Sequence, residues 1–297
     1  MFLFNSIKQH RLILSVALLL SIFYNWTFFR HVNQIYPALD GHFGFFVSLA
    51  ILVFTATALV LSILCIRFAT KPVLIVFVLA AAFSAYYMDT FDVIIDKVMI
   101  QNVAQTSVKE AGDLFTVKLV FYAIGLGILP ALWVYRHPHT SFAWRKGLSS
   151  RLALIGVLLL LVGSQALIFS KNYASFFREQ KTVRYYVNPL NPIYSVFNFI
   201  NGSVNSAPTV VTPLGIDAKV TPNNTHRELI IIVLGETARS DRFSLNGYDK
   251  PTNPLLAQQK VISFKNFTSC GTSTAVSVPC MFSPFGRADY SDKKFKG

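Results

Sequence analysis

The chain has 297 residues, 53% of them hydrophobic, and its mean hydropathy of +0.48 is too apolar for an ordinary soluble protein. Its formal net charge is +13, but many of the basic residues flank apolar runs and form no stripe with interleaved aromatic residues, so no nucleic-acid partner is expected. Residues 1–170 hold the apolar runs, and residues 171–297 have the composition of a soluble region. We therefore expect two units, one in the membrane and one in water.

Five apolar runs are long enough to cross a bilayer, which requires roughly 20 mainly apolar residues. They lie near residues 12–29, 43–66, 72–91, 115–135 and 152–170. The first run lacks a small-x-small cleavage site and continues into an aromatic belt, which predicts a retained helix rather than a removed signal peptide. We therefore predict a membrane domain of five transmembrane helices over residues 1–170, with an external loop at residues 92–114.

Basic residues are distributed unequally among the loops between these runs. Lys and Arg are concentrated before the first run, between the second and third, and between the fourth and fifth. Since cytoplasmic loops carry the excess of Lys and Arg, the N-terminus is predicted to be cytoplasmic and the chain after residue 170 to be exported. Cys270 and Cys280 then lie where disulfides persist, so we expect a bond between them, with two free thiols as the alternative.

Residues 171–225 are predicted to connect the membrane domain to the exported domain. Residues 171–178 have the pattern of an amphipathic helix on the membrane surface, with its aromatic side chains towards lipid. Pro189 and Pro192 are expected to break any helix. Residues 201–225 are rich in Asn, Ser, Pro and Thr, which is typical of a linker.

The exported domain begins with a continuous run of β-branched and aliphatic residues at 229–234. Such a run suits a central parallel strand that is covered on both faces. Glu236 follows it, and ligands of open α/β sheets collect at the carboxyl ends of the strands. Its carboxylate is therefore either part of a binding site or a partner for the dipole of a following helix.

A cluster of hydroxyl side chains lies between the two cysteines of the exported domain. An unaided hydroxyl is a weak nucleophile, and no histidine follows His226 to act as a base within this segment. Activation by a metal remains, with Glu236 as a zinc ligand beside the hydroxyl. A helix beginning at Thr274 would also favour a bound phosphate through its free N–H groups. The alternative is that these hydroxyls only cap the helix.

Three motifs are specific enough to indicate a protein family: residues 235–248 (GETARSDRFSLNGY), 252–254 (TNP) and 269–283 (SCGTSTAVSVPCMFS). They are long and nearly uninterrupted, and they closely resemble the lipid A phosphoethanolamine transferases, which include the mobile colistin-resistance enzymes. The resemblance extends over the whole chain, because the five-run layout and the aromatic patch at residues 173–177 match as well.

The resemblance implies a set of site residues. Thr274 matches the nucleophile of the family, which becomes modified with phosphoethanolamine. Glu236 and Thr274 match residues that contact a catalytic Zn²⁺, and Cys270 and Cys280 match the first disulfide of the family.

The resemblance also implies a substrate site in the loop at residues 92–114. Asn102, Thr106 and Glu110 match residues that bind the phosphoethanolamine group, and their spacing places them on one helix face. The alternative for these three residues is a solvated face of an amphipathic helix.

The implied fold after residue 226 is the start of an α/β domain similar to alkaline phosphatases and sulfatases. The implied reaction takes place at the bacterial inner membrane. Thr274 attacks phosphatidylethanolamine, diacylglycerol leaves, and phosphoethanolamine passes to a phosphate of lipid A. The added amine lowers the negative charge of the surface, which weakens its attraction for cationic peptides such as colistin. We expect membrane lipids as further partners, and a monomer.

The sequence ends at Gly297, shortly after the nucleophile motif, whereas members of the family continue much further. The Asp and His zinc ligands of the family have no counterpart here, and zinc sites use three or four protein ligands. Residues 226–297 are therefore expected to fold poorly alone and the 297-residue chain to be inactive. The alternatives are another lipopolysaccharide sugar or a periplasmic glucan as acceptor, a sulfatase-like hydrolase or phosphoglycerol transferase, and a non-catalytic membrane remnant.

Overall fold

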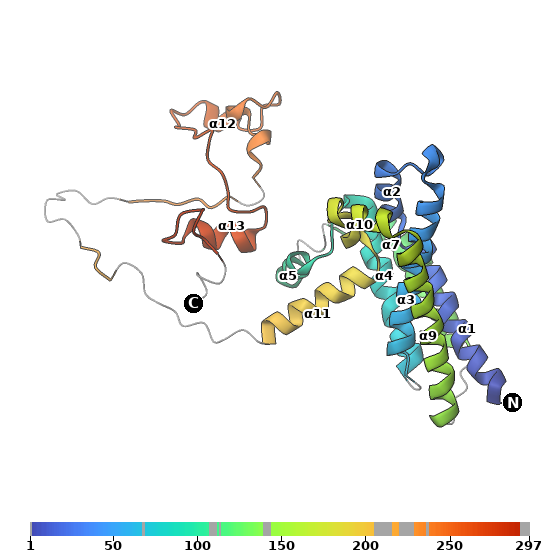
Figure 1. The fold of residues 1–297 in the computed structure, drawn as a ribbon. Helices are drawn as coiled ribbons and strands as arrows, with labels where there is room; N and C mark the ends of the chain where they lie inside the picture. Colours follow the sequence, from blue (N-terminus) through green and yellow to red (C-terminus); the bar gives the residue numbers. More distant parts are fainter. Residues whose placement is uncertain are drawn as a thin grey trace. The chain divides into compact units, whose positions relative to one another are not determined.

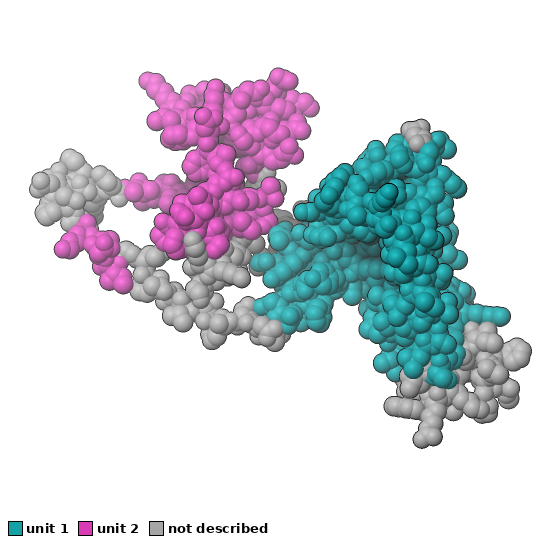
Figure 2. Space-filling model, in the orientation of Figure 1, with its two compact units in different colours: residues 1–205 teal, residues 206–297 magenta. Residues whose placement is uncertain are grey.

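The computed structural model describes residues 2–66, 69–106, 112, 114–138, 144–204, 216–219, 229–235 and 238–291. The chain is divided into two compact units, Met1–Asn205 and Ser206–Gly297 (Figures 1 and 2). The boundary at Asn205 lies within the predicted connector of residues 171–225, and helices α10 (Ser170–Glu179) and α11 (Leu190–Val204) of that connector pack within the first unit.

Long apolar helices build the first unit. Four segments are long and apolar enough to cross a membrane: α3 (Phe43–Leu64), α4 (Thr70–Phe91), a third composed of α7 (Val117–Tyr122), η3 (Ala123–Ile128) and α8 (Leu129–Arg136), and Ser149–Ile168 within α9 (Trp144–Ile168). A fifth span is possible as a bent pair, formed by the apolar part of α1 (Phe2–Phe23) and by α2 (Trp26–Ile35), which meet at 54°. The five predicted runs therefore match helical segments.

The first predicted run differs from the structure, because it is not continuous over residues 12–29. The helix stops at Phe23 and a new helix begins at Trp26. The buried amide of Asn25 donates one hydrogen bond to the Leu20 carbonyl at 2.9 Å and another to the Asn188 carbonyl at 2.7 Å. An Asn side chain that bonds to backbone groups in this way competes with the helical ladder, which explains the break.

Small and aliphatic side chains form the centre of the bundle. Ala17, Ala58, Ala81 and Ala85 are completely buried where α1, α3 and α4 meet. Small residues let membrane helices approach closely, so dispersion contacts stabilise their packing. The outer surface carries exposed apolar residues instead, such as Leu160 on α9, as expected for a surface that faces lipid.

Aromatic side chains fix α10 to the bundle. The rings of Tyr173 and Phe176 lie 5.6 Å and 5.8 Å from the ring of Phe45 on α3, and the Tyr173 hydroxyl donates to Ser48 Oγ at 3.2 Å. The predicted amphipathic helix is therefore present, but the prediction that its aromatic side chains face lipid was wrong for these two. They are buried against protein because α3 offers an aromatic surface at the same level.

The two prolines after α10 mark the start of a helix. Pro189 precedes α11, and Pro192 lies in its first turn, where a missing N–H costs no hydrogen bond. The helix continues to Val204, so it includes the first residues of the segment predicted to be a linker. Of the remaining linker, only residues 216–219 lie among the described ones.

Short elements make up the described part of the second unit. They are η5 (Ser240–Arg242), η6 (Ser244–Asn246), α12 (Pro254–Ala257) and α13 (Thr274–Met281). The predicted buried strand at residues 229–234 is not formed in this structure, and the first five of these side chains are 71–87% exposed. A strand needs a neighbour to satisfy its N–H and C=O groups, and no described residue pairs with this run.

Candidate functional site around Thr274

Thr274 is the first residue of α13 and its side chain is exposed. Ser273 precedes it with extended backbone (φ −99°, ψ 145°), and its carbonyl accepts hydrogen bonds from the N–H groups of Val276 and Ser277 at 3.1 Å and 2.9 Å. The helix therefore begins where the sequence predicts. Ser273 makes no side-chain cap hydrogen bond, and its buried Oγ has no partner among the described residues, so the capping interpretation fails for this hydroxyl.

A disulfide closes the loop that leads into this helix. Cys270 is bonded to Cys280, ten residues further along, as predicted. The loop also approaches α13 closely at Gly271, where an added Cβ would lie 2.9 Å from Cγ1 of Val276. Together the disulfide and this contact hold the residues before Thr274 against the helix.

Replacing Gly271 with Ala is expected to force the loop away from α13, because Val276 leaves no room for a methyl group. The local cost should be roughly 1–3 kcal/mol, typical of overpacking. The measurement is the fraction of protein in which Cys270 and Cys280 are disulfide-bonded, at increasing concentrations of a thiol reductant. Free thiols are alkylated and counted by mass spectrometry. A second substitution, Val276→Ala, should restore the parent value, whereas the control Gly286→Ala should have no effect because nothing lies within 4 Å of its Cβ. An unchanged oxidised fraction in Gly271→Ala would contradict the contact.

Thr274 borders a cavity of about 1080 Å³ within the second unit. Its wall combines hydroxyl groups on one helix turn with apolar side chains. Gly235 and Ala238, which flank Glu236 in sequence, are part of the same wall. Other residues that line it are Gly271, Thr272, Ser277, Val278, Phe243 and Phe267.

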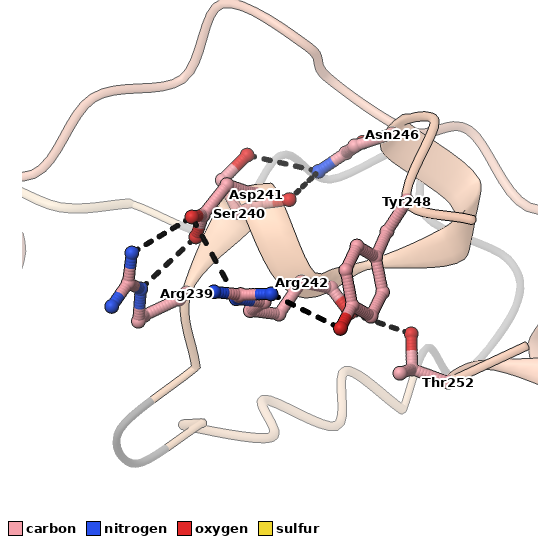
Figure 3. Close-up of polar contacts among 7 residues, drawn as sticks. All are labelled: Arg239, Ser240, Asp241, Arg242, Asn246, Tyr248 and Thr252. Atoms are coloured by element: carbon pink, nitrogen blue, oxygen red, sulfur yellow. Dashed lines mark hydrogen bonds and ion pairs between the residues drawn. The ribbon is translucent and has the colours of Figure 1, made fainter. Parts of the chain in front are cut away.

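The motif that follows Glu236 forms a hydrogen-bonded turn (Figure 3). Arg239 donates two hydrogen bonds to the Asp241 carboxylate, at 3.0 Å and 2.8 Å, and Asn246 donates to the Ser240 hydroxyl and carbonyl at 2.9 Å and 3.2 Å. The hydrogen bonds from Arg239 hold the pKa of Asp241 below its ordinary value. Asp241 therefore stays ionised to a lower pH than an unpaired Asp does.

A second set of contacts ties this turn to the TNP motif. The Thr252 hydroxyl donates to the Arg242 carbonyl at 2.6 Å, and Arg242 donates to the Tyr248 hydroxyl at 3.0 Å (Figure 3). The Thr252 hydroxyl also accepts from the Ser244 N–H at 3.0 Å. The sequence marks these residues only as parts of motifs. These residues stabilise the turn mainly through hydrogen bonds to backbone carbonyl and N–H groups. A sequence pattern does not predict such bonds, because every residue carries the same backbone groups.

Asn102 and Thr106 lie at the end of α5 (Lys97–Gln105), in the first unit. The Thr106 hydroxyl donates to the Asn102 carbonyl at 2.7 Å, so the two residues are one turn apart as predicted. Asn102 is half-buried and Thr106 is exposed. Glu110, the third residue of the predicted set, lies outside the described residues.

The described residues do not complete a zinc site. Nowhere among them do three His, Cys, Asp or Glu side chains come together as a metal-binding group. Glu236 lies outside the described residues, and Thr274 offers a single hydroxyl. Protein zinc sites use three or four ligands, so zinc at Thr274 would require others besides these two residues.

Each of the two units matches a known protein family. Residues 53–204, more than half of the chain, match the family model of the phosphoethanolamine transferases EptA/EptB, and residues 228–295 match the sulfatase model. The chain belongs to the EptA/EptB phosphoethanolamine transferase family. Among relatives of this family, it is 41% identical to phosphatidylethanolamine transferase Mcr-1 of Escherichia coli over 292 residues, which are 96% of this chain and 54% of that protein.

Other members of the family give the same result. Phosphoethanolamine transferase EptA of Escherichia coli (strain K12) is 34% identical over 299 residues, covering 97% of this chain and 54% of its own length. The solved structure of lipooligosaccharide phosphoethanolamine transferase A (EptA), an integral membrane protein of Neisseria meningitidis, matches with a TM-score of 0.87 and 32% identity, over 96% of this chain and 54% of that one. The chain thus spans about half the length of these relatives.

Proposed function

We propose that this protein is an inner-membrane phosphoethanolamine transferase that moves phosphoethanolamine from phosphatidylethanolamine to a phosphate of lipid A. The observation that carries the proposal is the position of Thr274, exposed at the first residue of a helix and at the wall of a cavity. A hydroxyl in this place reaches a bound phosphate, and the free N–H groups of the helix start favour the negative charge.

The reaction has two steps, and Thr274 carries the transferred group between them. In the first step, Thr274 Oγ bonds to the phosphorus of phosphatidylethanolamine, the bond from phosphorus to the glycerol oxygen breaks, and diacylglycerol leaves with the proton. In the second step, a phosphate oxygen of lipid A attacks the same phosphorus, the bond to Thr274 Oγ breaks, and the threonine oxygen takes up the proton of the attacking phosphate group. The lipooligosaccharide named as substrate of the Neisseria relative supports this acceptor.

The proposed cofactor is Zn²⁺, with Glu236 and Thr274 among its ligands, and it would supply activation of the threonine hydroxyl. The chain's own contribution is positional. The Cys270–Cys280 bond and the close approach of Gly271 to Val276 hold the loop before the nucleophile in place.

We assign the orientation from the loop charges, with the N-terminus in the cytoplasm and the second unit in the periplasm. Resistance to colistin would follow from the added amine, since it lowers the negative charge of lipid A. The direct test is lipid A mass spectrometry from a Gram-negative host that expresses the chain joined to the remaining part of Mcr-1. A phosphoethanolamine adduct supports the proposal, whereas an adduct on another sugar or on periplasmic glucans alone would change the acceptor. The 297-residue chain without the part of Mcr-1 is measured in the same assay, which tests the prediction that it is inactive.

Asn102→Ala and Thr106→Val are each expected to lower transfer by roughly tenfold, the effect of losing one hydrogen bond to a charged group. Both residues are proposed to bind the phosphoethanolamine group of the donor. The measurement is the initial rate with labelled phosphatidylethanolamine at several concentrations, using the fusion described above. Gln101→Ala is a matched control from the same helix, and equal losses in all three variants would show a structural effect on α5 instead.

A further inference from the structure

Asp89 lies in the last turn of α4, at the end of a membrane span, and forms no ion pair with any described residue. Its Oδ1 accepts a hydrogen bond from Thr27 Oγ1 at 2.5 Å, and its Oδ2 accepts one from the Tyr122 hydroxyl at 3.1 Å. Asp92, three residues further, differs because it contacts Arg30 and His31 of α2. The two carboxylates at the same end of the bundle are therefore satisfied in different ways.

The described residues orient the Asp89 carboxylate, and none of them forms an ion pair with it. Both of its donors are neutral hydroxyls, one from α2 and one from α7, and the side chain is half-buried. A carboxylate in a spanning segment is expensive without a counter-charge, and such residues mark binding sites or ion paths by default. A cation from outside the described chain would complete the site.

Lys118 supplies the opposite charge nearby. It lies one turn before Tyr122 on α7, is exposed, and forms no ion pair with a described acidic residue. Its ammonium group is 5.8 Å from the centre of the Tyr122 ring. Tyr122 thus has a carboxylate at its hydroxyl and an ammonium over its ring, which together complement a zwitterion.

The surroundings indicate that this zwitterion comes from the membrane. Trp26, Phe91 and Phe121, from the same three helices, are 67%, 47% and 72% exposed. Exposed aromatic side chains at the ends of spans are typical of the lipid headgroup level. In Figure 1, α2 and α7 lie towards the same end of the bundle, and α4 contacts both. The headgroup of a lipid would therefore lie at the height of Asp89.

We propose that Asp89 and Lys118, which lie on either side of Tyr122, bind the headgroup of an aminophospholipid. The ammonium group donates hydrogen bonds to the Asp89 carboxylate, the lipid phosphate accepts from Lys118, and the acyl chains follow the apolar outer surface of α7. Thr27 and Tyr122 are positioning residues that orient the carboxylate. None of these residues belongs to the set proposed for transfer (Asn102, Thr106 and Thr274), and lipid binding by Asp89 and Lys118 does not depend on the transfer chemistry.

The test is native mass spectrometry of the purified 297-residue protein in detergent, titrated with phosphatidylethanolamine, phosphatidylcholine and phosphatidylglycerol. The parent should retain phosphatidylethanolamine roughly tenfold better than phosphatidylcholine, whose quaternary ammonium donates no hydrogen bond. Asp89→Asn should lower this preference clearly, the remaining part belonging to the donor site proposed at Asn102 and Thr106, and Lys118→Gln should weaken binding of both zwitterionic lipids. The charge-matched controls Asp217→Asn and Lys181→Gln, both at exposed positions, should behave as the parent does.

If Asp89→Asn does not fold, two other variants still test the proposal. Thr27→Val and Tyr122→Phe each remove one hydrogen bond and keep the charge, so they should retain a reduced preference for phosphatidylethanolamine. A parent without preference between the two zwitterionic lipids would overturn the proposal. So would a folded Asp89→Asn protein that keeps the full preference, because Asp89 would then only tie α2, α4 and α7 together.

Discussion

Thr274→Ala is expected to abolish transfer of phosphoethanolamine to lipid A, with a loss of roughly 10³-fold or more, typical of removing a nucleophile that forms a covalent intermediate. The alanine keeps the start of α13 and cannot bond to phosphorus. Lipid A mass spectrometry from the host expressing the fusion with Mcr-1 measures the loss. Intact-protein mass spectrometry with phosphatidylethanolamine and no acceptor should show an added phosphoethanolamine group on the parent and none on the variant.

Two variants control for the helix itself. Thr274→Ser keeps a hydroxyl at the same place and should retain measurable transfer. Thr272→Ala removes an exposed hydroxyl that also lines the cavity, and its effect should be small. Normal transfer by Thr274→Ala would refute the assignment of the nucleophile, and a modified Thr274→Ala protein would move that role to another residue.

Asn188→Ala is expected to destabilise the first unit by about 2–4 kcal/mol, because two buried carbonyl groups lose their donor. Asn188 is fully buried, and its Nδ2 donates to the Tyr24 carbonyl at 3.0 Å and to the Ala81 carbonyl at 2.9 Å. The backbone of Asn188 is also bonded to the side chain of Asn25. The Asn25 amide donates to the Asn188 carbonyl and accepts from the Asn188 N–H. The measurement is the unfolding free energy of the purified protein in detergent.

A double-mutant cycle separates this network from simple loss of volume. Asn25→Ala removes the bonds to the Asn188 backbone and also favours a continuous helix through the break. Because the two amides share one network, the double variant should lose less than the sum of the single losses. Asn172→Ala, at an exposed position of α10, is the control and should change stability little. Additive losses would contradict the coupling between the two residues.

Local patterns predicted the features that depend on a few neighbouring residues. Hydropathy located the candidate spanning segments found among the described residues, because about 20 apolar residues are long enough whatever they pack against. The start of α13 at Thr274 and the Cys270–Cys280 bond were also predicted, the helix start from a short segment and the bond from the predicted compartment. The substrate triad was located only through resemblance, and the structure describes two of its three residues.

The remaining features depend on partners far away in the chain. The break at Asn25 requires Asn188, 163 residues later, and the burial of Tyr173 requires Ser48, 125 residues earlier. The run at residues 229–234 has the composition of a buried strand, yet it is exposed here because strand pairing is a property of two segments. By itself, the sequence determined the membrane class, the family motifs and the nucleophile candidate, since each is written in local residue types. Only the tertiary structure decided which polar groups pair, as with Asp89 and Tyr122, because a hydrogen bond needs two atoms that folding brings together.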